Sequence, residues 1–335
     1  MKRTWKALII LALITGIFAV PFLGSAAQVH RVAPGENLYL IANQYDISLQ
    51  ELLRMNAYLR QPDRIHPGQL LIVPRPSVQE PEIKVPDSQV PDPEQPERDL
   101  GIPDVTPTPA PPLDQPRQPS ISQLVNMFSG RFFLKGPAHD NRIAITFDDG
   151  PDEVYTPQVL DVLKEYNVPA TFFLIGQEVD KHPQVTGRIA AEGHLIGSHS
   201  WSHPDFRRLT GHDITVEMKR TRDALVKATG LRPYLMRPPY GAVNTEVLNQ
   251  LVGLDYYVVN WSVDSVDWRD QEVDPILVNT LKDVREGAIM LFHSAGGGSC
   301  RQATVDALPE LIETLRMQGY TFVTVDELLN IPRYR

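Results

Sequence analysis

The sequence predicts an α/β protein: a distorted seven-stranded (β/α) barrel, preceded by a small strand–helix–helix–strand module. Between residues 142 and 325, seven short apolar runs alternate with helical patterns, as in parallel strands joined by helices. Five of these runs end in polar residues that can take part in catalysis. Because the loops after the strands of such a barrel form one face, where its active sites lie, we expect these residues to meet and the protein to be an enzyme.

Each expected strand is a short apolar run bounded by turn or helix signals. Right-handed crossovers between successive parallel strands make a barrel the simplest closure. An open, doubly wound sheet is the alternative. In such a sheet the polar residues would lie along one edge instead of around a common cleft. The expected strands are Arg142–Phe147, Ala170–Leu174, His194–Gly197, Tyr234–Met236, Tyr256–Asn260, Ala288–Phe292 and Thr321–Thr324.

Helices between these strands are indicated by apolar residues at helical spacing. After Thr156, the side chains of Val159 and Leu163 fall on one face of an expected helix. Another helix is expected to run from Asp213 to Gly230, because glycine is a typical residue at a helix C-terminus. The remaining helical patterns are a stretch reaching Ala191 and the segments 244–252, 275–284, 303–318 and 325–329.

Residues 1–27 are predicted to be an export signal. Basic residues come first, an apolar run covers Ala7–Gly24, and small residues follow at 25–27, which makes Gln28 the expected new N-terminus. An uncleaved membrane anchor is the alternative, because the apolar run is long for a signal and borderline for a membrane span. We therefore expect a secreted, cell-wall protein that contacts the membrane only if this segment is retained.

The net charge and the cysteine content exclude some classes of protein and of site. A formal net charge of −9 gives no basic surface of the kind that nucleic-acid binders need. The single cysteine, Cys300, rules out a disulfide within the chain, and its glycine-rich surroundings mark it as a loop thiol rather than a nucleophile. Residues 76–119 are dense in proline and poor in aromatic residues, which predicts a disordered linker between a module at 28–75 and a domain at 120–335.

The module at 28–75 reads strand, helix, helix, strand. A strand over 29–32 leads into a turn, Ser48 is placed to cap the second of two short helices, and 70–74 forms the last strand. Its sequence, VAPGENLYLIANQYDISLQELLRMN…IHPGQLLIVP, resembles the lysin motif (LysM) from end to end. The resemblance implies binding to N-acetylglucosamine-containing glycans, meaning peptidoglycan or chitin. A folded spacer with no ligand is the alternative.

The polar residues at the first and third strand ends are the ligand types of a divalent metal site. Asp148 and Asp149 follow the first strand, so one carboxylate can bind a metal while its neighbour faces the substrate. His199 and His203 lie four positions apart after the third strand, a spacing that is weak evidence alone. Two imidazoles and one carboxylate leave a metal such as zinc an open position, where a bound water loses a proton near neutral pH.

The other strand ends carry an arginine turn and a second acid–histidine pair. In Arg237-Pro238-Pro239-Tyr240-Gly241 the prolines have no N–H, which leaves Tyr240 and Gly241 as free backbone donors. Asp267-Trp268 and Leu291-Phe292-His293 complete the set. Each has a structural alternative: a salt bridge for Arg237, packing for the tryptophan and a satisfied buried ring for the histidine. The functional interpretation rests on their joint position at strand ends.

Together these segments resemble the five ordered motifs of the polysaccharide deacetylases, carbohydrate esterase family 4. The resemblance covers roughly residues 140–325, includes the segment 168–173, and shows no departure at any motif position. It implies a deacetylase whose metal, Zn²⁺ or alternatively Co²⁺ or another divalent ion, is held by three ligands: Asp149, His199 and His203.

The resemblance also implies roles for the remaining motif residues. Asp148 would be the base that deprotonates the metal-bound water, and Arg237 would pair with it to keep it ionised. The Tyr240 backbone N–H and the metal would hold the oxyanion. His293 would protonate the departing amine, with Asp267 orienting it and raising its proton affinity. The acyl pocket would be lined by Trp268 and Leu291.

The sequence therefore predicts a secreted, monomeric, metal-dependent carbohydrate deacetylase that acts on cell-wall glycan. Peptidoglycan N-acetylglucosamine is the first expectation for the substrate, chitin or its oligomers the second, and acetylated xylan the third. A catalytically inactive wall-binding protein is the alternative from another class, and the intact motif set argues against it. A structural spore-coat or envelope component is a further alternative that the sequence leaves open.

Overall fold

The computed structural model of the protein describes residues 27–62, 64–75, 118–138, 140–296 and 300–335. The predicted export signal, apart from Ala27, and the predicted linker, apart from residues 118 and 119, lie outside them. Among the described residues, no helix combines the length and apolar character that crossing a membrane requires.

The N-terminal module has the predicted strand–helix–helix–strand order. Strand β1 (Ala27–Arg31) pairs antiparallel with β2 (Leu70–Pro74), and helices α3 (Leu38–Gln44) and α4 (Leu49–Met55) lie between them in the chain. Ser48 caps α4 as expected, since its side chain accepts a hydrogen bond from the Glu51 N–H. A small core fills the module, made by Val32, Leu38, Ile41, Ala42, Leu52, Leu71 and Val73.

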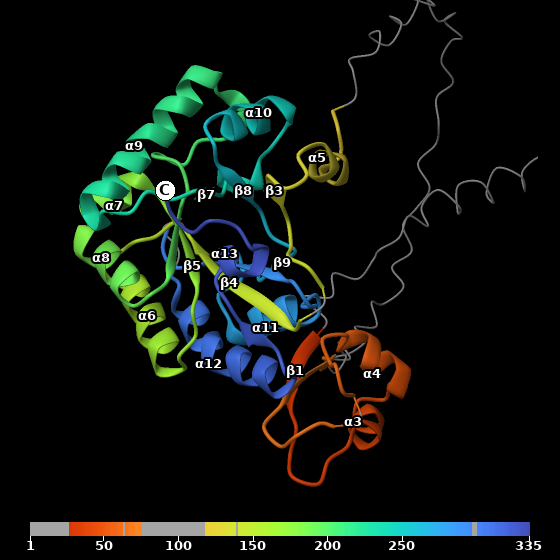
Figure 1. The fold of residues 1–335 in the computed structure, drawn as a ribbon. Coiled ribbons are helices and arrows are strands. Elements are labelled where there is room, and N and C mark those ends of the chain that lie inside the picture. Colours follow the sequence, from red (N-terminus) through yellow and green to blue (C-terminus); the bar gives the residue numbers. More distant parts are fainter. Residues whose placement is uncertain (1–26, 63, 76–117, 139, 297–299) are drawn as a thin grey trace, which may run out of the picture. The chain divides into compact units, whose positions relative to one another are not determined.

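The larger domain contains a curved sheet in which every pairing is parallel (Figure 1). The sheet order is β3-β8-β7-β6-β5-β4-β10-β9, and β11 pairs with the first two residues of β4. The strands are β3 (Phe132–Phe133), β4 (Arg142–Asp148), β5 (Thr171–Leu174), β6 (Leu195–Ser198), β7 (Leu235–Met236), β8 (Tyr257–Val259), β9 (Val263–Asp264), β10 (Ile289–His293) and β11 (Thr321–Phe322).

The predicted fold class is confirmed, with a difference in strand number. All seven expected strands are present, and β3 and β9 are additional. Each of the two has only two residues, too few for an apolar pattern to show in the sequence. Among the described residues β3 and β9 do not pair with each other, so the sheet curls like a barrel without closing through that pair.

Most of the helices lie around the outside of the curved sheet (Figure 1). Gly230 ends α9 in a left-handed conformation (φ 73°), as the sequence predicts. The stretch expected to reach Ala191 is two helices rather than one. The helices are α5 (Ile121–Met127), α6 (Tyr155–Glu165), α7 (Gly176–Lys181), α8 (Pro183–Ala191), α9 (Gly211–Thr229), α10 (Thr245–Gly253), α11 (Val273–Leu281), α12 (Gln302–Met317) and α13 (Val325–Leu329), with short 3-10 turns η1 (Phe206–Arg208) and η2 (Pro239–Gly241).

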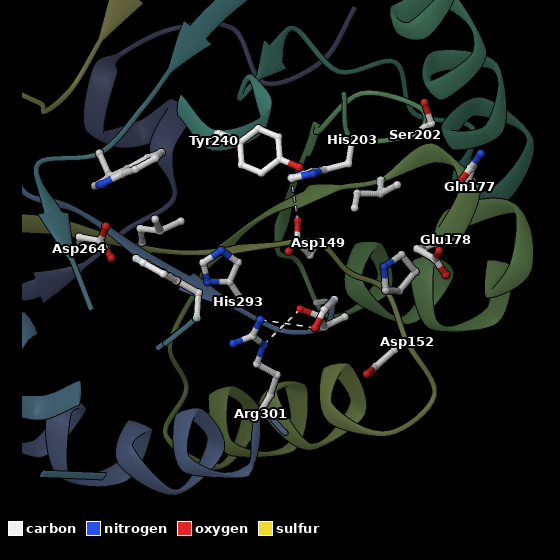
Figure 2. Close-up of a pocket in the computed structure, with 17 residues that line it drawn as sticks. Asp149, Asp152, Gln177, Glu178, Ser202, His203, Tyr240, Asp264, His293 and Arg301 are labelled. Atoms are coloured by element: carbon white, nitrogen blue, oxygen red, sulfur yellow. Dashed lines mark hydrogen bonds and ion pairs between the residues drawn. The ribbon is translucent and has the colours of Figure 1, made fainter. Parts of the chain in front are cut away.

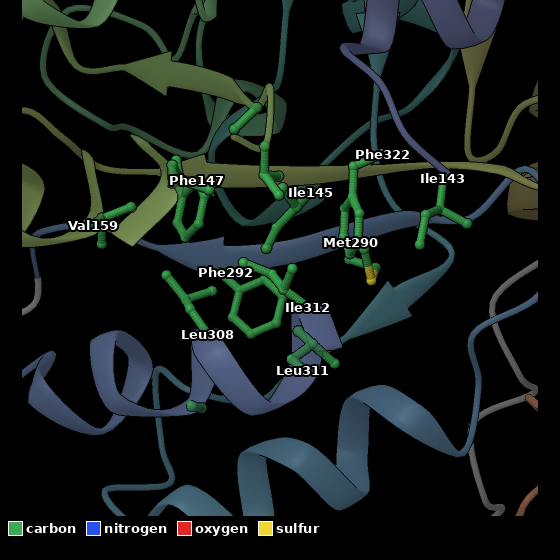
Figure 3. Close-up of a cluster of buried hydrophobic side chains, with 14 of the residues drawn as sticks. Ile143, Ile145, Phe147, Val159, Met290, Phe292, Leu308, Leu311, Ile312 and Phe322 are labelled. Carbon is green, nitrogen blue, oxygen red and sulfur yellow. The ribbon is translucent and has the colours of Figure 1, made fainter. Parts of the chain in front are cut away.

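The main core lies between α12 and the two central strands, β4 and β10. Figure 3 shows Phe147 and Phe292 of these strands facing Leu308 of α12, and all three are buried. The ring of Phe147 also stacks on Phe172 of β5, with 5.1 Å between the centroids. Burying a side chain of this size contributes roughly 1.5–3 kcal/mol to stability. This core fixes the positions of β4 and β10, whose C-terminal ends carry Asp148 and His293.

The parallel register brings the polar strand ends to one level. In the pairing of β10 with β4, His293 lies beside Asp148. Ser198 of β6 lies beside Met236 of β7, so the next residues along each strand, His199 and Arg237, emerge together. The sequence prediction that the strand ends meet on one face is therefore correct for these strands.

Candidate active site

A cleft of about 970 Å³ opens at these strand ends. Figure 2 shows Asp149, His203, Tyr240 and His293 around it, and Trp268 and Leu291 also line it. Asp148, His199, Arg237 and Asp267 lie more deeply, each with no more than 3% of its surface exposed. All ten residues predicted from the sequence thus lie in or directly beneath one cleft.

Asp149, His199 and His203 form a cluster that fits a metal ion. One ligand atom from each lies within 4.8 Å of the other two. The Nε2 atoms of His199 and His203 lie 3.5 and 3.4 Å from Oδ1 of Asp149. That buried oxygen has no hydrogen-bond partner among the described residues, which is unusual for a buried carboxylate. A set of two nitrogens and one oxygen suits zinc or a similar divalent ion.

The environment of His199 prepares its ring for metal binding. Its Nδ1 lies 2.7 Å from the backbone carbonyl of Arg237, which can only accept, so Nδ1 carries the proton and Nε2 is free to act as a ligand. Burial lowers the pKa of His199 to about 3, with nearby charges of both signs contributing less. The imidazole is therefore neutral at physiological pH, the form that binds metals.

Asp148 is a buried carboxylate paired with a buried arginine. Nη1 of Arg237 donates to Oδ1 of Asp148 at 2.8 Å, and it also donates to the hydroxyl of Thr146. The predicted pair is present, but its electrostatic effect is only partial. Burial raises the pKa of Asp148, and the Arg237 charge opposes this without cancelling it. A carboxylate of raised pKa is a better proton acceptor near neutral pH.

His293 and Asp267 form a second acid–histidine pair. Nδ1 of His293 lies 2.7 Å from Oδ1 of Asp267, and the His293 backbone N–H donates to Oδ2 at 2.9 Å. Burial alone would lower the pKa of His293. The hydrogen bond and charge of Asp267, together with the charges of Asp148 and Asp149, outweigh burial and raise it. His293 thus keeps its proton to a higher pH than an ordinary histidine.

Strained backbone conformations gather at the cleft. Asp149, Ser200, His203, Tyr240 and Val266 all have φ between 58° and 70°, in the left-handed region that residues other than glycine rarely adopt. For β-branched Val266 this is a clear outlier. Strain of this kind persists where the surrounding structure enforces it, commonly at functional sites.

The turn after β7 carries Tyr240, which lines the cleft. The Gly241 N–H is used, because it donates to the Pro238 carbonyl at 3.0 Å. The Tyr240 N–H has no backbone partner among the described residues, so it is available to donate to another group. The Tyr240 ring contacts His203 edge-on, 4.6 Å between centroids, and is 68% exposed.

Several residues that support the site could not be found from sequence patterns. Glu217 of α9 accepts hydrogen bonds from the backbone N–H groups of Trp201 and Ser202 and from the Ser202 hydroxyl, at 2.8–2.9 Å. It therefore holds the loop that carries His199 and His203. Arg301 and Thr304 likewise donate hydrogen bonds to Asp267, the partner of His293. All three come from helices or helix starts remote in sequence from the residues they hold, where no motif marks them.

Two sequence models of known families match the chain. The polysaccharide deacetylase model matches residues 135–259, and the LysM domain model matches residues 30–74. The first match includes the strand ends that carry Asp148, Asp149, His199, His203 and Arg237.

Curated relatives agree with these matches. A peptidoglycan-N-acetylglucosamine deacetylase of Bacillus cereus is 38% identical over 61% of this chain and 74% of its own length. The peptidoglycan-N-acetylmuramic acid deacetylase PdaC of Bacillus subtilis is 38% identical over 58% of the chain but only 40% of its own length. A chitooligosaccharide deacetylase of Rhizobium leguminosarum is 38% identical over 56% of the chain and 92% of its own length.

Solved structures share the fold. The Bc1960 peptidoglycan N-acetylglucosamine deacetylase, solved with an N-hydroxybenzamide, is 36% identical, with a TM-score of 0.62 over 64% of this chain and 100% of that one. BA3943 of Bacillus anthracis, described as a CE4 family pseudoenzyme, is 27% identical, with a TM-score of 0.56 over 61% of this chain and 70% of that one. The chain therefore belongs to the polysaccharide deacetylase family, CE4, whose enzymes hydrolyse the N-acetyl groups of carbohydrates, and it also carries a LysM domain.

Proposed function

We propose that the chain is a secreted, divalent-metal-dependent deacetylase that removes N-acetyl groups from N-acetylglucosamine units of peptidoglycan. One observation carries the proposal: a three-atom ligand cluster, a buried carboxylate and a carboxylate-held histidine converge on one cleft. The choice of peptidoglycan is supported by the B. cereus relative and by the Bc1960 structure.

The proposed metal site uses Asp149, His199 and His203. Their ligand atoms are close, one of them is an unpaired buried oxygen, and His199 is held neutral with Nε2 free. A divalent ion bound there supplies Lewis-acid activation of water and of the acetamide carbonyl. Zn²⁺ is our first choice for this donor set, with Co²⁺ an alternative.

The remaining steps are proton transfers by residues on either side of the cleft. Asp148 accepts a proton from the water that attacks the acetamide carbon, and Arg237 holds its carboxylate in place. The Tyr240 N–H donates to the oxygen on which charge develops. His293 donates a proton to the nitrogen as the C–N bond breaks, which releases acetate and leaves the sugar with a free amine. No covalent intermediate with the protein is needed.

The LysM domain supports a location at the cell wall. Since LysM domains are wall-associated modules and the relatives act on wall polymer, we propose that this module raises the local concentration of glycan around the catalytic domain. The predicted export signal, the linker and a monomeric state complete this proposal.

Two alternatives have specific observations behind them. The R. leguminosarum relative favours chitin oligomers as a substrate. BA3943 favours a non-catalytic role, because it keeps this fold as a pseudoenzyme. Acetate release, measured side by side on peptidoglycan, chitin oligomers and acetylated xylan, separates these outcomes. No release from any of them by metal-loaded protein supports the non-catalytic alternative.

Chelation is expected to remove the activity, and Zn²⁺ or Co²⁺ to restore it. We expect acetate release to fall at least about 100-fold, since the attacking water is no longer activated. His199→Ala should lower metal content strongly. His194→Ala is the matched control: this histidine is also buried, but its Nδ1 accepts from the Ala170 N–H and it stands outside the ligand cluster. Undiminished activity after exhaustive chelation would contradict the metal proposal.

Deletion of residues 28–119 is expected to separate chemistry from wall binding. Turnover of small soluble oligosaccharides should stay within about twofold of the full chain, because a tethered module acts through effective concentration. Acetate release from insoluble wall should fall roughly tenfold or more. Loss of the small-substrate activity would show that the catalytic domain depends on the deleted segment, and the predicted linker would then be wrong.

A further inference from the structure

The start of α12 contacts the pair formed by His293 and Asp267. Thr304, in the first turn of this helix, donates its hydroxyl to Oδ2 of Asp267 at 2.9 Å. Arg301, at the N-cap position, donates Nη1 to the Asp267 backbone carbonyl, also at 2.9 Å. Both side chains are buried, with 1% and 2% of their surfaces exposed. One helix start therefore holds both the carboxylate and the main chain of Asp267.

The hydrogen bonds to the carboxylate show what Thr304 adds. Oδ1 accepts from Nδ1 of His293, and Oδ2 accepts from the backbone N–H of the same residue. Among the described residues, two of the three donors to this carboxylate belong to His293, and the third is the Thr304 hydroxyl. A second donor on Oδ2 fixes the carboxylate plane, because an ionised carboxylate accepts in defined directions. Oδ1 is then left facing the imidazole.

Arg301 links the main chain of Asp267 to the segment that follows His293. Besides Asp267, it donates to the carbonyls of Ala295 at 3.3 Å and Gly296 at 3.4 Å, just beyond His293. Gly296 lies tightly against Asp149: a Cβ atom there would come within 2.6 Å of Oδ2 of that ligand. No carboxylate pairs with the Arg301 side chain among the described residues. Burying a guanidinium that contacts only carbonyl oxygens costs desolvation free energy, because no opposite charge compensates for the lost water. This cost suggests that Arg301 has a structural role at the site.

We propose that Thr304 and Arg301 are positioning residues for the acid step. They hold Asp267 so that its carboxylate faces Nδ1 of His293 and the rest of the ring is presented to the cleft. This inference rests on the proposed function, in which His293 protonates the departing amine. Neither residue touches the substrate, and both act through Asp267.

The test compares Thr304→Val, which removes the hydroxyl and keeps the shape, with Thr304→Ser, which keeps the hydroxyl. We expect the valine variant to lose roughly five- to tenfold in kcat with KM unchanged, the value of one buried hydrogen bond. The serine variant should recover most of that loss. Thr314→Val is the matched control: Thr314 lies on the same helix, is also 1% exposed and does not line the cleft, so kcat should not change.

A spectroscopic readout keeps this test separate from the proposed function. In labelled full-length protein, the ring Nδ1 proton of His293 should give a downfield signal that is shifted or lost in Thr304→Val and restored in Thr304→Ser. Arg301→Lys, which keeps the charge but not the three-carbonyl contact, should shift it as well. An unchanged signal and an unchanged kcat in Thr304→Val would overturn the positioning role. Absence of acetate release by the wild type, with the signal responding as expected, would overturn the proposed function alone.

Discussion

Replacement of Asp148 by asparagine is expected to abolish acetate release while the protein keeps its metal. An amide cannot accept the proton of the attacking water, and a general-base loss of roughly 10²–10⁴-fold follows. The metal should stay because the three ligand atoms belong to Asp149, His199 and His203. Metal content and acetate release are measured on the same samples.

Asp149→Asn is the matched variant, one residue along the same strand end. An amide oxygen is an uncharged and weaker ligand, so this variant should lose metal affinity as well as activity. Thermal unfolding is the control for Asp148→Asn, because Arg237 is fully buried and its carboxylate partner is removed. If Asp148→Asn emptied the site while Asp149→Asn kept it filled, the roles of the two carboxylates would be reversed.

His293→Ala is the second change with a large expected effect. It should retain metal but slow expulsion of the amine by roughly 10²–10⁴-fold, the usual contribution of a general acid. Because the ring hydrogen bonds to Asp267 and stands outside the ligand cluster, the metal content is the internal control. Full acetate release by this variant would mean that another group protonates the leaving nitrogen.

The pH dependence of acetate release by the wild type should reflect the titration of His293. Asp267 first, then Asp148 and Asp149, raise the pKa of His293 above its ordinary 6.5 against the effect of burial. A raised pKa keeps the acid protonated to higher pH, so activity should be lost as pH rises through that raised value. Asp267→Asn removes the main contribution and should move this alkaline limb to lower pH. An unmoved limb would show that a different group titrates there.

Much of the fold was predictable because its signals are local. Apolar runs such as Arg142–Phe147 and Ala288–Phe292 alternate with helical patterns, and Gly230 marks a helix end that the structure confirms. The two-residue strands β3 and β9 were missed, since a pair of residues has no period. Whether the sheet closes depends on the accumulated twist of all its strands, which no single segment encodes.

The residues that the sequence singles out do lie in or beneath one cleft, because they follow the ends of neighbouring parallel strands, and their catalytic roles stay predictions. What the sequence left undecided was their electrostatics. Arg237 pairs with Asp148 as expected, and its charge lowers the pKa of that carboxyl, but burial raises the pKa by more. Burial depends on how completely neighbouring strands and loops cover a group, and here its effect exceeds that of the paired charge.

The sequence by itself determined the fold class, and it predicted which residues would meet as a candidate ligand set and acid–base pair, because strand ends in a parallel sheet meet at one face wherever the intervening helices lie. Only the tertiary structure decided which groups hold these residues in place. Glu217, Arg301 and Thr304 act on side chains and loops far from them in the chain. Such contacts depend on the packing of whole helices against the sheet, and a hydrogen bond of this kind requires an accuracy of a few tenths of an ångström, which local sequence patterns do not specify.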